Sequence, residues 1–367
     1  MSLIRPSRNN DFTHSCSTFM LAHGNDLLIG HNLDDYIEVP GLIVINKRGV
    51  EKENISWKEL AQLPIPFVRR SYPKVRWTSQ YGSITYNTGG KEFIDGGLNE
   101  AGLYVGEMTL MGTRYPKADS LPKIYHHQWM QYLLDNFESV AQVLESLKKI
   151  IVDGHCQWHF FIADRSGDAA IIEFLEANPI LYRGENMPFK VLCNDRYSEE
   201  LENLARFAGF GGKEEVDFQD ITSSARRFPQ AAVMFREFEC NPRETALDFA
   251  FKVLRKIKGD NNKWGILYDV KNFRMYFYTS RAEAIRYVDF TAFDFSDKIP
   301  SMVLDLQKDL SGDVSQYFKP FNPLENKKNI FWNSIHLPGI RGFVYRYMLI
   351  PIWMQRMTNV AVSFVPR

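Results

Sequence analysis

The amino-acid sequence predicts an α+β fold in which helices cover antiparallel sheets. Segments typical of strands and of helices follow each other in the order strands, helices, strands, helices, strands. Several predicted strand pairs are joined by short turns, as antiparallel neighbours are. No long stretch rich in proline, glycine or serine divides the chain, so we expect one domain, residues 16–367, after a separate first segment, residues 1–15.

The first predicted element is a hairpin that begins next to Cys16. A short apolar run at 19–21 precedes a turn at 24–26, and a second apolar run at 27–29 leads into Gly-His-Asn-Leu-Asp at 30–34. Because a tight turn places the ends of two antiparallel strands opposite each other, we expect the hairpin to bring Asp34 beside Cys16.

The remaining elements follow from periodicity and turn residues. The segment 99–102 (Asn-Glu-Ala-Gly) reads as a turn that needs the backbone freedom of Asn and Gly. Predicted strands cover 42–45, 75–86, 103–105, 158–164, 169–175, 265–268 and 273–279, and predicted helices cover 124–137, a run from Ser139, 198–207, 228–239 and 243–257.

Composition excludes some classes of function. Lys+Arg and Asp+Glu both number 44, so the chain lacks the basic surplus that electrostatic capture of nucleic acid requires. Aromatic residues make up 14% of the 367 residues, which favours a wide apolar interior or an apolar pocket. The apolar run at 343–354 is too short to span a bilayer and is interrupted by Arg346 and Pro351, so we expect a docking segment and no stable membrane insertion.

The first fifteen residues leave the cellular compartment open. They are polar and lack the apolar stretch of a signal peptide. They fit a short propeptide on a cytoplasmic protein, or the remnant of a periplasmic or secreted protein whose signal peptide has been replaced.

The four cysteines, Cys16, Cys156, Cys193 and Cys240, are too few and too dispersed for a disulfide framework. His155, Cys156 and His159 lie close together in the sequence. In the strand expected there Cys156 would point away from both histidines, so we expect no metal site and no cofactor.

Cys16 could supply both a nucleophile and its base. If the peptide bond before it were cut, one residue would hold a thiol and a free α-amine, whose reference pKa values are roughly 8.5 and roughly 7.7–8.0. The amine could then take the proton of the thiol near neutral pH.

Six separated motifs around these residues resemble a known family. They occur in one order: CSTF at 16–19, GHNLD at 30–34, WTSQYGSIT at 77–85, GLNEAGL at 97–103, VLCN at 191–194 and SSARRF at 223–228. The chain resembles the choloylglycine hydrolase / penicillin V acylase family of bacterial N-terminal-nucleophile (Ntn) hydrolases, in particular its linear amide C–N hydrolase branch. The resemblance implies a four-layer αββα sandwich with two stacked antiparallel sheets, and autoprocessing that exposes the cysteine.

The resemblance also implies roles for individual residues. Cys16 matches the nucleophile, and Asp34 matches a carboxylate that holds its α-amine. Asn194 matches an amide that receives the oxyanion, and Arg227, with Arg226 as its rival, matches an arginine whose charge favours the thiolate.

Two substrate-binding positions differ from the bile-salt hydrolase pattern. His31 stands where that group has arginine, which would replace a permanent charge by one that titrates near neutrality. Thr109 stands where an asparagine or tyrosine contributes to the oxyanion site, and it offers a hydroxyl instead. Both changes make bile-salt specificity less expected than hydrolysis itself.

We therefore expect hydrolysis of a small N-acyl amide through a cysteine thioester. An acyltransferase would use the same residues, because an amine would only have to intercept the thioester. An inactive, ligand-binding relative is the third alternative, since an uncut segment before Cys16 would leave its amine blocked. Family members are often dimers or tetramers, so a homo-oligomer is also implied.

Overall fold

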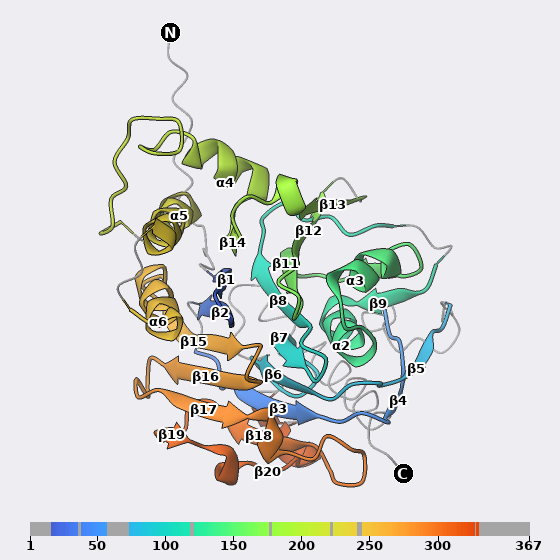
Figure 1. Ribbon diagram of the computed structural model, residues 1–367. Helices are drawn as coiled ribbons and strands as arrows, with labels where there is room; N and C mark the ends of the chain where they lie inside the picture. The colour runs from blue at the N-terminus through green and yellow to red at the C-terminus, as the bar shows by residue number, and fades with distance from the viewer. Residues whose placement is uncertain are drawn as a thin grey trace.

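The protein forms four layers in the order helices, sheet, sheet, helices (Figure 1). The computed structural model describes residues 16–35, 38–56, 73–117, 121–175, 178–220, 223–240, 244–326 and 328–329. The predicted segment 1–15 and the apolar run at 343–354 lie outside the described residues. None of the helices within these ranges is long and apolar enough to cross a membrane.

The first sheet has seven strands and contains the predicted hairpin. Adjacent strands of this sheet pair antiparallel, except that β17 and β19, at one edge, pair parallel. Its order is β14 (Val191–Leu192), β1 (Ser17–His23), β2 (Asp26–Asp34), β15 (Asn262–Asp269), β16 (Arg274–Thr279), β17 (Arg286–Asp289) and β19 (Gly312–Asp313).

The β1–β2 hairpin confirms the prediction for residues 16–34. Ser17 pairs with Asn32 and His23 pairs with Asp26, so that only Gly24 and Asn25 form the turn. Gly24 has a φ of +58°, a left-handed conformation that glycine adopts at little cost. The hairpin therefore places Cys16, which directly precedes β1, close to Asp34 at the end of β2.

The second sheet has nine strands, all paired antiparallel. Its order is β13 (Asn178–Arg183), β12 (Ala169–Leu175), β11 (Trp158–Ala163), β8 (Tyr104–Thr109), β7 (Ile94–Asn99), β6 (Ser83–Asn87), β3 (Leu42–Asn46), β18 (Met302–Asp305) and β20 (Lys319–Pro320). Two small two-stranded sheets pair β4 (Glu51–Glu53) with β5 (Arg76–Thr78), and β9 (Lys123–Tyr125) with β10 (Ile151–Asp153).

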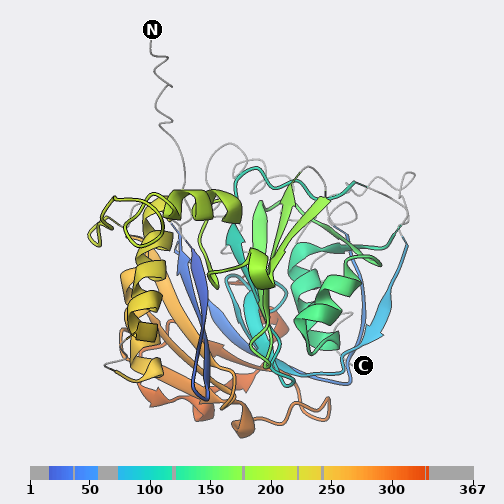
Figure 2. The same cartoon turned by 45° about the horizontal axis from the view of Figure 1, so that its top comes forward.

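Helices cover the outer face of each large sheet, as Figure 2 shows. α5 (Ser224–Cys240) and α6 (Ala246–Lys256), drawn in yellow, lie beside the seven-stranded sheet, with α4 (Tyr197–Leu204) packed on α5. α2 (His126–Asn136) and α3 (Val140–Ser146), drawn in green, lie on the other side, where α2 packs on β7 and β8.

Burial on both faces explains why some central strands read as continuous apolar runs. In β11, Phe161 packs in the core that includes the hairpin, whereas its neighbours Phe160 and Ile162 pack with the residues of α2 and α3. Between the sheets, Tyr268 donates a hydrogen bond to the carbonyl of Ile84 (2.9 Å) and thereby links the two layers.

Several element boundaries differ from the predictions. The strand predicted over 75–86 is interrupted, because Ser79 bonds to Val50 and the N–H groups of Gln80 and Tyr81 donate to the carbonyl of Asp135. The helix expected over 243–257 begins at Ala246, where the side chain of Thr245 caps the N–H of Asp248.

The prediction of a strand around His155 is also wrong, since β11 begins only at Trp158. Residues 154–157 form a bend between β10 and β11. The alternation that would have turned Cys156 away from its neighbouring histidines is therefore absent from this segment.

Candidate active site

Arg227 joins two of the other predicted site residues. Its Nη1 donates a hydrogen bond to the backbone carbonyl of Cys16, and its Nη2 donates to Oδ1 of Asn194, both at 3.0 Å. The side chain comes from the first turn of α5 and is buried, with a relative exposure of 1%. A guanidinium is suited to this place because its fork of donors can bind two acceptors in one plane.

Asn194 lies where the chain leaves β14, the edge strand next to β1. Its Nδ2 donates to the carbonyl of Thr109 (2.9 Å), at the end of β8 in the opposite sheet. Asn194 therefore connects the Cys16 sheet to the Thr109 sheet. Its amide has two N–H groups, and the bond to Thr109 uses one of them.

A buried network holds the backbone around Asn194. Ser224 accepts hydrogen bonds from the N–H groups of Asn194 (2.8 Å) and Asp195 (3.0 Å), and it donates to Glu200. On the other side, His159 bonds the carbonyl of Cys193 (2.8 Å). The sequence did not predict Glu200 or His159 as part of this site. The one signal was Ser224, which lies in the motif at 223–228 and donates to Glu200.

Asp34 is held by the segment that leads from α6 into β15. Its two oxygens accept hydrogen bonds from the N–H of Gly259 (2.9 Å) and from Nδ2 of Asn262 (2.8 Å). Burial raises the pKa of Asp34 to about 6, and the nearby charge of Arg227 opposes this rise.

Cys16 is almost fully buried, at 2% relative exposure. Burial is the main reason why the pKa of its thiol is raised well above the usual value, and the carboxylates of Glu107 and Asp34 add to the effect. A hydrogen bond from the backbone of Asp34 acts in the opposite direction. The thiol is therefore protonated at neutral pH in the chain as it stands, and attack by its sulfur requires a base.

His31 corrects one expectation. Its ring is fully buried between the sheets, where Nδ1 lies 2.7 Å from Oγ1 of Thr18 and the ring packs on Tyr86. Burial lowers the pKa of His31 to about 3. The expectation that His31 titrates near neutrality is therefore wrong, while its contact with substrate stays a prediction.

The structure separates Arg226 from Arg227. The side chain of Arg226 is about half exposed and forms an ion pair with Asp220 at 3.2 Å. Arg227 is the arginine that faces Cys16 and Asn194. Thr109 reaches the site through its backbone carbonyl, and the role of its hydroxyl stays a prediction.

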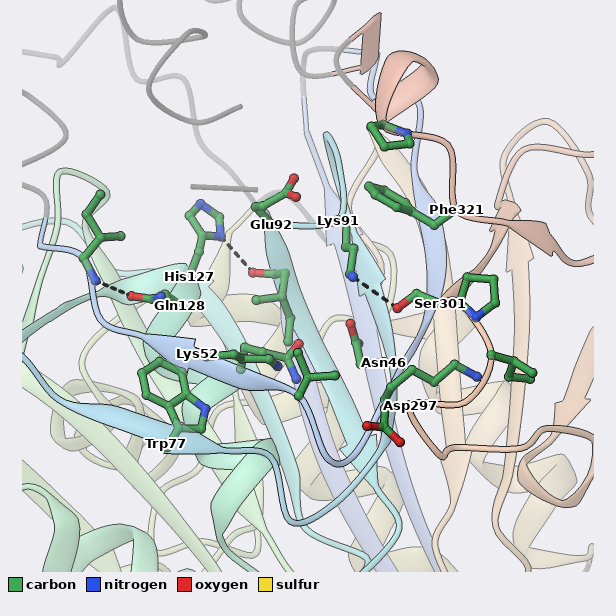
Figure 3. A pocket seen from close by; sticks show the side chains of 18 of the residues that line it. Asn46, Lys52, Trp77, Lys91, Glu92, His127, Gln128, Asp297, Ser301 and Phe321 are labelled. Carbon is green, nitrogen blue, oxygen red and sulfur yellow. Dashed lines mark hydrogen bonds between the residues drawn. The ribbon is translucent and has the colours of Figure 1, made fainter. Parts of the chain in front are cut away.

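A cavity of about 400 Å³ lies beside α2, next to β3 and β7, and its lining contains none of the six predicted site residues (Figure 3). Three of its polar groups have partners within the protein. Lys91 donates to Ser301 (3.1 Å), His127 bonds the carbonyl of Ile94 (2.9 Å), and Gln128 accepts from the N–H of Ile55 (2.7 Å). The Cys16 cluster, which lies apart from this cavity, is therefore the candidate active site.

An αββα sandwich with a buried cysteine at the start of an inner strand defines the fold class of the N-terminal-nucleophile hydrolases. The model of a family described as linear amide C–N hydrolases, choloylglycine hydrolase family, matches residues 16–232. The chain belongs to this family, and it is a hydrolase that acts on C–N bonds of linear amides.

Individual relatives agree with this assignment. The chain is 25% identical over 299 residues to a penicillin V acylase from Pectobacterium atrosepticum, a match that covers 68% of this chain and 78% of the relative. A penicillin V acylase structure from Agrobacterium tumefaciens matches with a TM-score of 0.69 and 22% identity over 84% of this chain and 98% of the other. A variant of the conjugated bile acid hydrolase from Clostridium perfringens matches with a TM-score of 0.65 and 18% identity, over 81% and 98%.

Proposed function

We propose that the protein hydrolyses N-acyl amides with Cys16 as nucleophile, after cleavage of the bond between Ser15 and Cys16. The observation that carries the proposal is the convergence on Cys16 of residues from distant motifs: Arg227 bonds its carbonyl, Asn194 bonds Arg227, and Thr109 bonds Asn194. The family match, which begins at Cys16, supports the same first residue for the mature chain. On this proposal residues 1–15 are a propeptide and residues 16–367 form the catalytic domain.

The free α-amine of Cys16 would be the base. The thiol is protonated at neutral pH. After burial, Glu107 and Asp34 raise its pKa most, so neither favours loss of the thiol proton. The buried ring of His31 bonds Thr18 and belongs to the core. An α-amine with a pKa near 8 can take the proton of the thiol, and Asp34 would hold the resulting ammonium.

The reaction would proceed in two steps. The sulfur of Cys16 attacks the amide carbon, and the free N–H of Asn194 stabilises the oxyanion. The ammonium gives its proton to the leaving nitrogen as the C–N bond breaks, which leaves a thioester on Cys16. Water, deprotonated by the same amine, then cleaves the thioester and releases the carboxylic acid.

For the substrate we propose an amide with an apolar acyl group, with penicillin V as the first member to test. The identity of 25% to the penicillin V acylase from Pectobacterium atrosepticum supports this choice. The replacement of arginine by His31, a ring that is neutral at physiological pH, makes a conjugated bile acid the weaker candidate.

The proposal is tested by intact-mass measurement together with a substrate panel. We expect the active protein to begin at Cys16 and to cleave at least one of penicillin V, N-acyl amino acids or N-acyl lactones in preference to glycine-conjugated bile acids. Cys16→Ser should lose activity, whereas Cys156→Ser serves as the control for a thiol outside the Cys16 cluster. Full activity in Cys16→Ala, or in a chain that retains residue 15, would overturn the proposal.

A further inference from the structure

Two histidines and a cysteine converge at the bend between β10 and β11. His126 starts helix α2, and His155 and Cys156 lie in the bend. One possible ligand atom of each residue lies within 4.8 Å of those of the other two. The sulfur of Cys156 lies 3.5 Å from Nε2 of His155, and the N–H of Cys156 lies 3.4 Å from Nε2 of His126.

The distance of 3.5 Å between the sulfur of Cys156 and Nε2 of His155 is close to that between two ligand atoms on one metal ion. Zinc bonds sulfur at roughly 2.3 Å and imidazole nitrogen at roughly 2.0–2.1 Å in a tetrahedron, which puts its ligand atoms roughly 3.3–3.6 Å apart. Two imidazoles and one thiolate are also the ligand types that zinc prefers. The Cys156–His155 pair is therefore already at ligand spacing, and a small movement of the His126 ligand atom, which lies within 4.8 Å of the other two, would complete the set.

The surroundings hold the two parts of the cluster together. A Cβ atom at residue 154 would lie 1.7 Å from Cδ2 of His126, so only Gly154 allows the bend to approach this ring. The His126 ring is also stacked on Tyr115 and packed against Trp158. The ring of His155 is stacked on Tyr125.

Burial and access fit an ion that enters from solvent. His126 is fully buried, and its Nδ1 has no hydrogen-bond partner within the described part of the chain. Cys156 is half-buried and His155 is exposed, so the cluster is open on one side.

We propose that His126, His155 and Cys156 bind a zinc-type divalent metal ion with three protein ligands and one open position. An open fourth position would be filled by water. The proposal does not depend on the proposed function, because none of the three residues belongs to the Cys16 cluster.

The test is Co²⁺ titration of the untagged full chain that carries Cys16→Ser, under reducing conditions. Removing Cys16 ensures that any sulfur-to-cobalt charge-transfer band comes from another thiolate. We expect one equivalent of Co²⁺ to give this band together with the intense visible bands of a tetrahedral ion, and Zn²⁺ to displace it. Failure of Co²⁺ to produce a charge-transfer band would overturn the proposal.

Matched variants identify the ligands. Adding Cys156→Ser should abolish the charge-transfer band, whereas adding Cys193→Ser should leave it unchanged. His155→Gln, an exposed position, should weaken Co²⁺ binding by at least about tenfold, since even outer-shell partners of a metal contribute that much. His23→Gln is its control and should leave the affinity unchanged. A band that persists in the Cys156→Ser chain would also overturn the proposal.

Discussion

Arg227 determines which way the side-chain amide of Asn194 faces. Its Nη2 donates to Oδ1 of Asn194 at 3.0 Å, so the amide oxygen is turned toward the guanidinium and Nδ2 is turned toward the carbonyl of Thr109, 2.9 Å away. The amide is thus held at both ends. Because Nδ2 carries two hydrogens and Thr109 takes one, the other can donate to a developing oxyanion without reorientation.

We predict that Asn194→Ala lowers kcat by on the order of 10²–10³, the usual loss when one oxyanion donor is removed. KM should change much less, because the donor acts mainly on charge that develops in the transition state. Steady-state kinetics with the best amide of the panel measures both constants. A variant with wild-type kcat would show that the Asn194 amide does not face the reacting carbonyl.

Arg227→Lys should lower kcat by about 10²-fold. A lysine cannot hold the Cys16 carbonyl and the Asn194 amide with one fixed fork, and a lost charge-assisted hydrogen bond is worth roughly 1.5–3 kcal/mol. The neighbour Arg226 offers a matched control, since its half-exposed side chain pairs with Asp220. Arg226→Lys should keep nearly full activity, and equal losses in the two variants would contradict the assignment of Arg227.

The hairpin was predictable because its information is local. A two-residue turn with glycine fixes the register, and the register alone carries Asp34 back to Cys16. The same holds for the helix that begins after Ser139, whose side chain accepts a hydrogen bond from the N–H of Gln142. The grouping of Asn194 and Arg227 with Cys16 rested instead on the family resemblance, because these residues are far apart in the chain.

Other features depend on tertiary contacts that no local pattern contains. The β propensity of residues 75–86 was read correctly, but it could not show that α2 would take the N–H groups of Gln80 and Tyr81. Strand β7 was missed because it contains two glycines. A Cβ at Gly96 would lie 2.2 Å from the hydroxyl of Tyr86, so the glycine makes room for a residue of the neighbouring strand. The burial of His31 depends in the same way on the second sheet.

We predict that Ser224 is a positioning residue whose hydroxyl acts through Asn194. Ser224→Ala leaves the N–H groups of Asn194 and Asp195 without their shared acceptor, which should lower the free energy of unfolding by roughly 1–3 kcal/mol. Displacement of the amide should reduce kcat by about 10- to 100-fold. A merely structural role would leave kcat of the folded enzyme unchanged.

Two neighbouring substitutions separate these outcomes. Ser224→Thr retains a hydroxyl and should recover most of kcat. Ser223→Ala removes an exposed hydroxyl one residue earlier, which has no bond to Asn194, and should leave kcat of the folded enzyme unchanged. Failure of Ser224→Thr to recover kcat, in a variant as stable as the wild type, would count against a role for the hydroxyl.

The buried ring of His31 predicts acid sensitivity of the fold. Its pKa is about 3 in the folded protein and about 6.5 when unfolded, because burial disfavours the charged form. Below pH 6.5 the unfolded chain therefore binds a proton that the folded chain does not, so stability falls as the pH falls and levels off near pH 3. At pH 4.5, two units below the unfolded pKa, this one group should cost about 3 kcal/mol.

A comparison with His31→Gln isolates that contribution. Urea unfolding at pH 7.5 and pH 4.5 gives the loss of stability for each protein, and the loss should be about 3 kcal/mol smaller in the variant. His126 and His127 are also buried with lowered pKa values, but they are present in both proteins, so their contributions cancel. Because glutamine does not titrate, the overall stability of the variant at pH 7.5 does not affect the difference. An identical loss in the two proteins would mean that His31 takes up its proton without leaving the core.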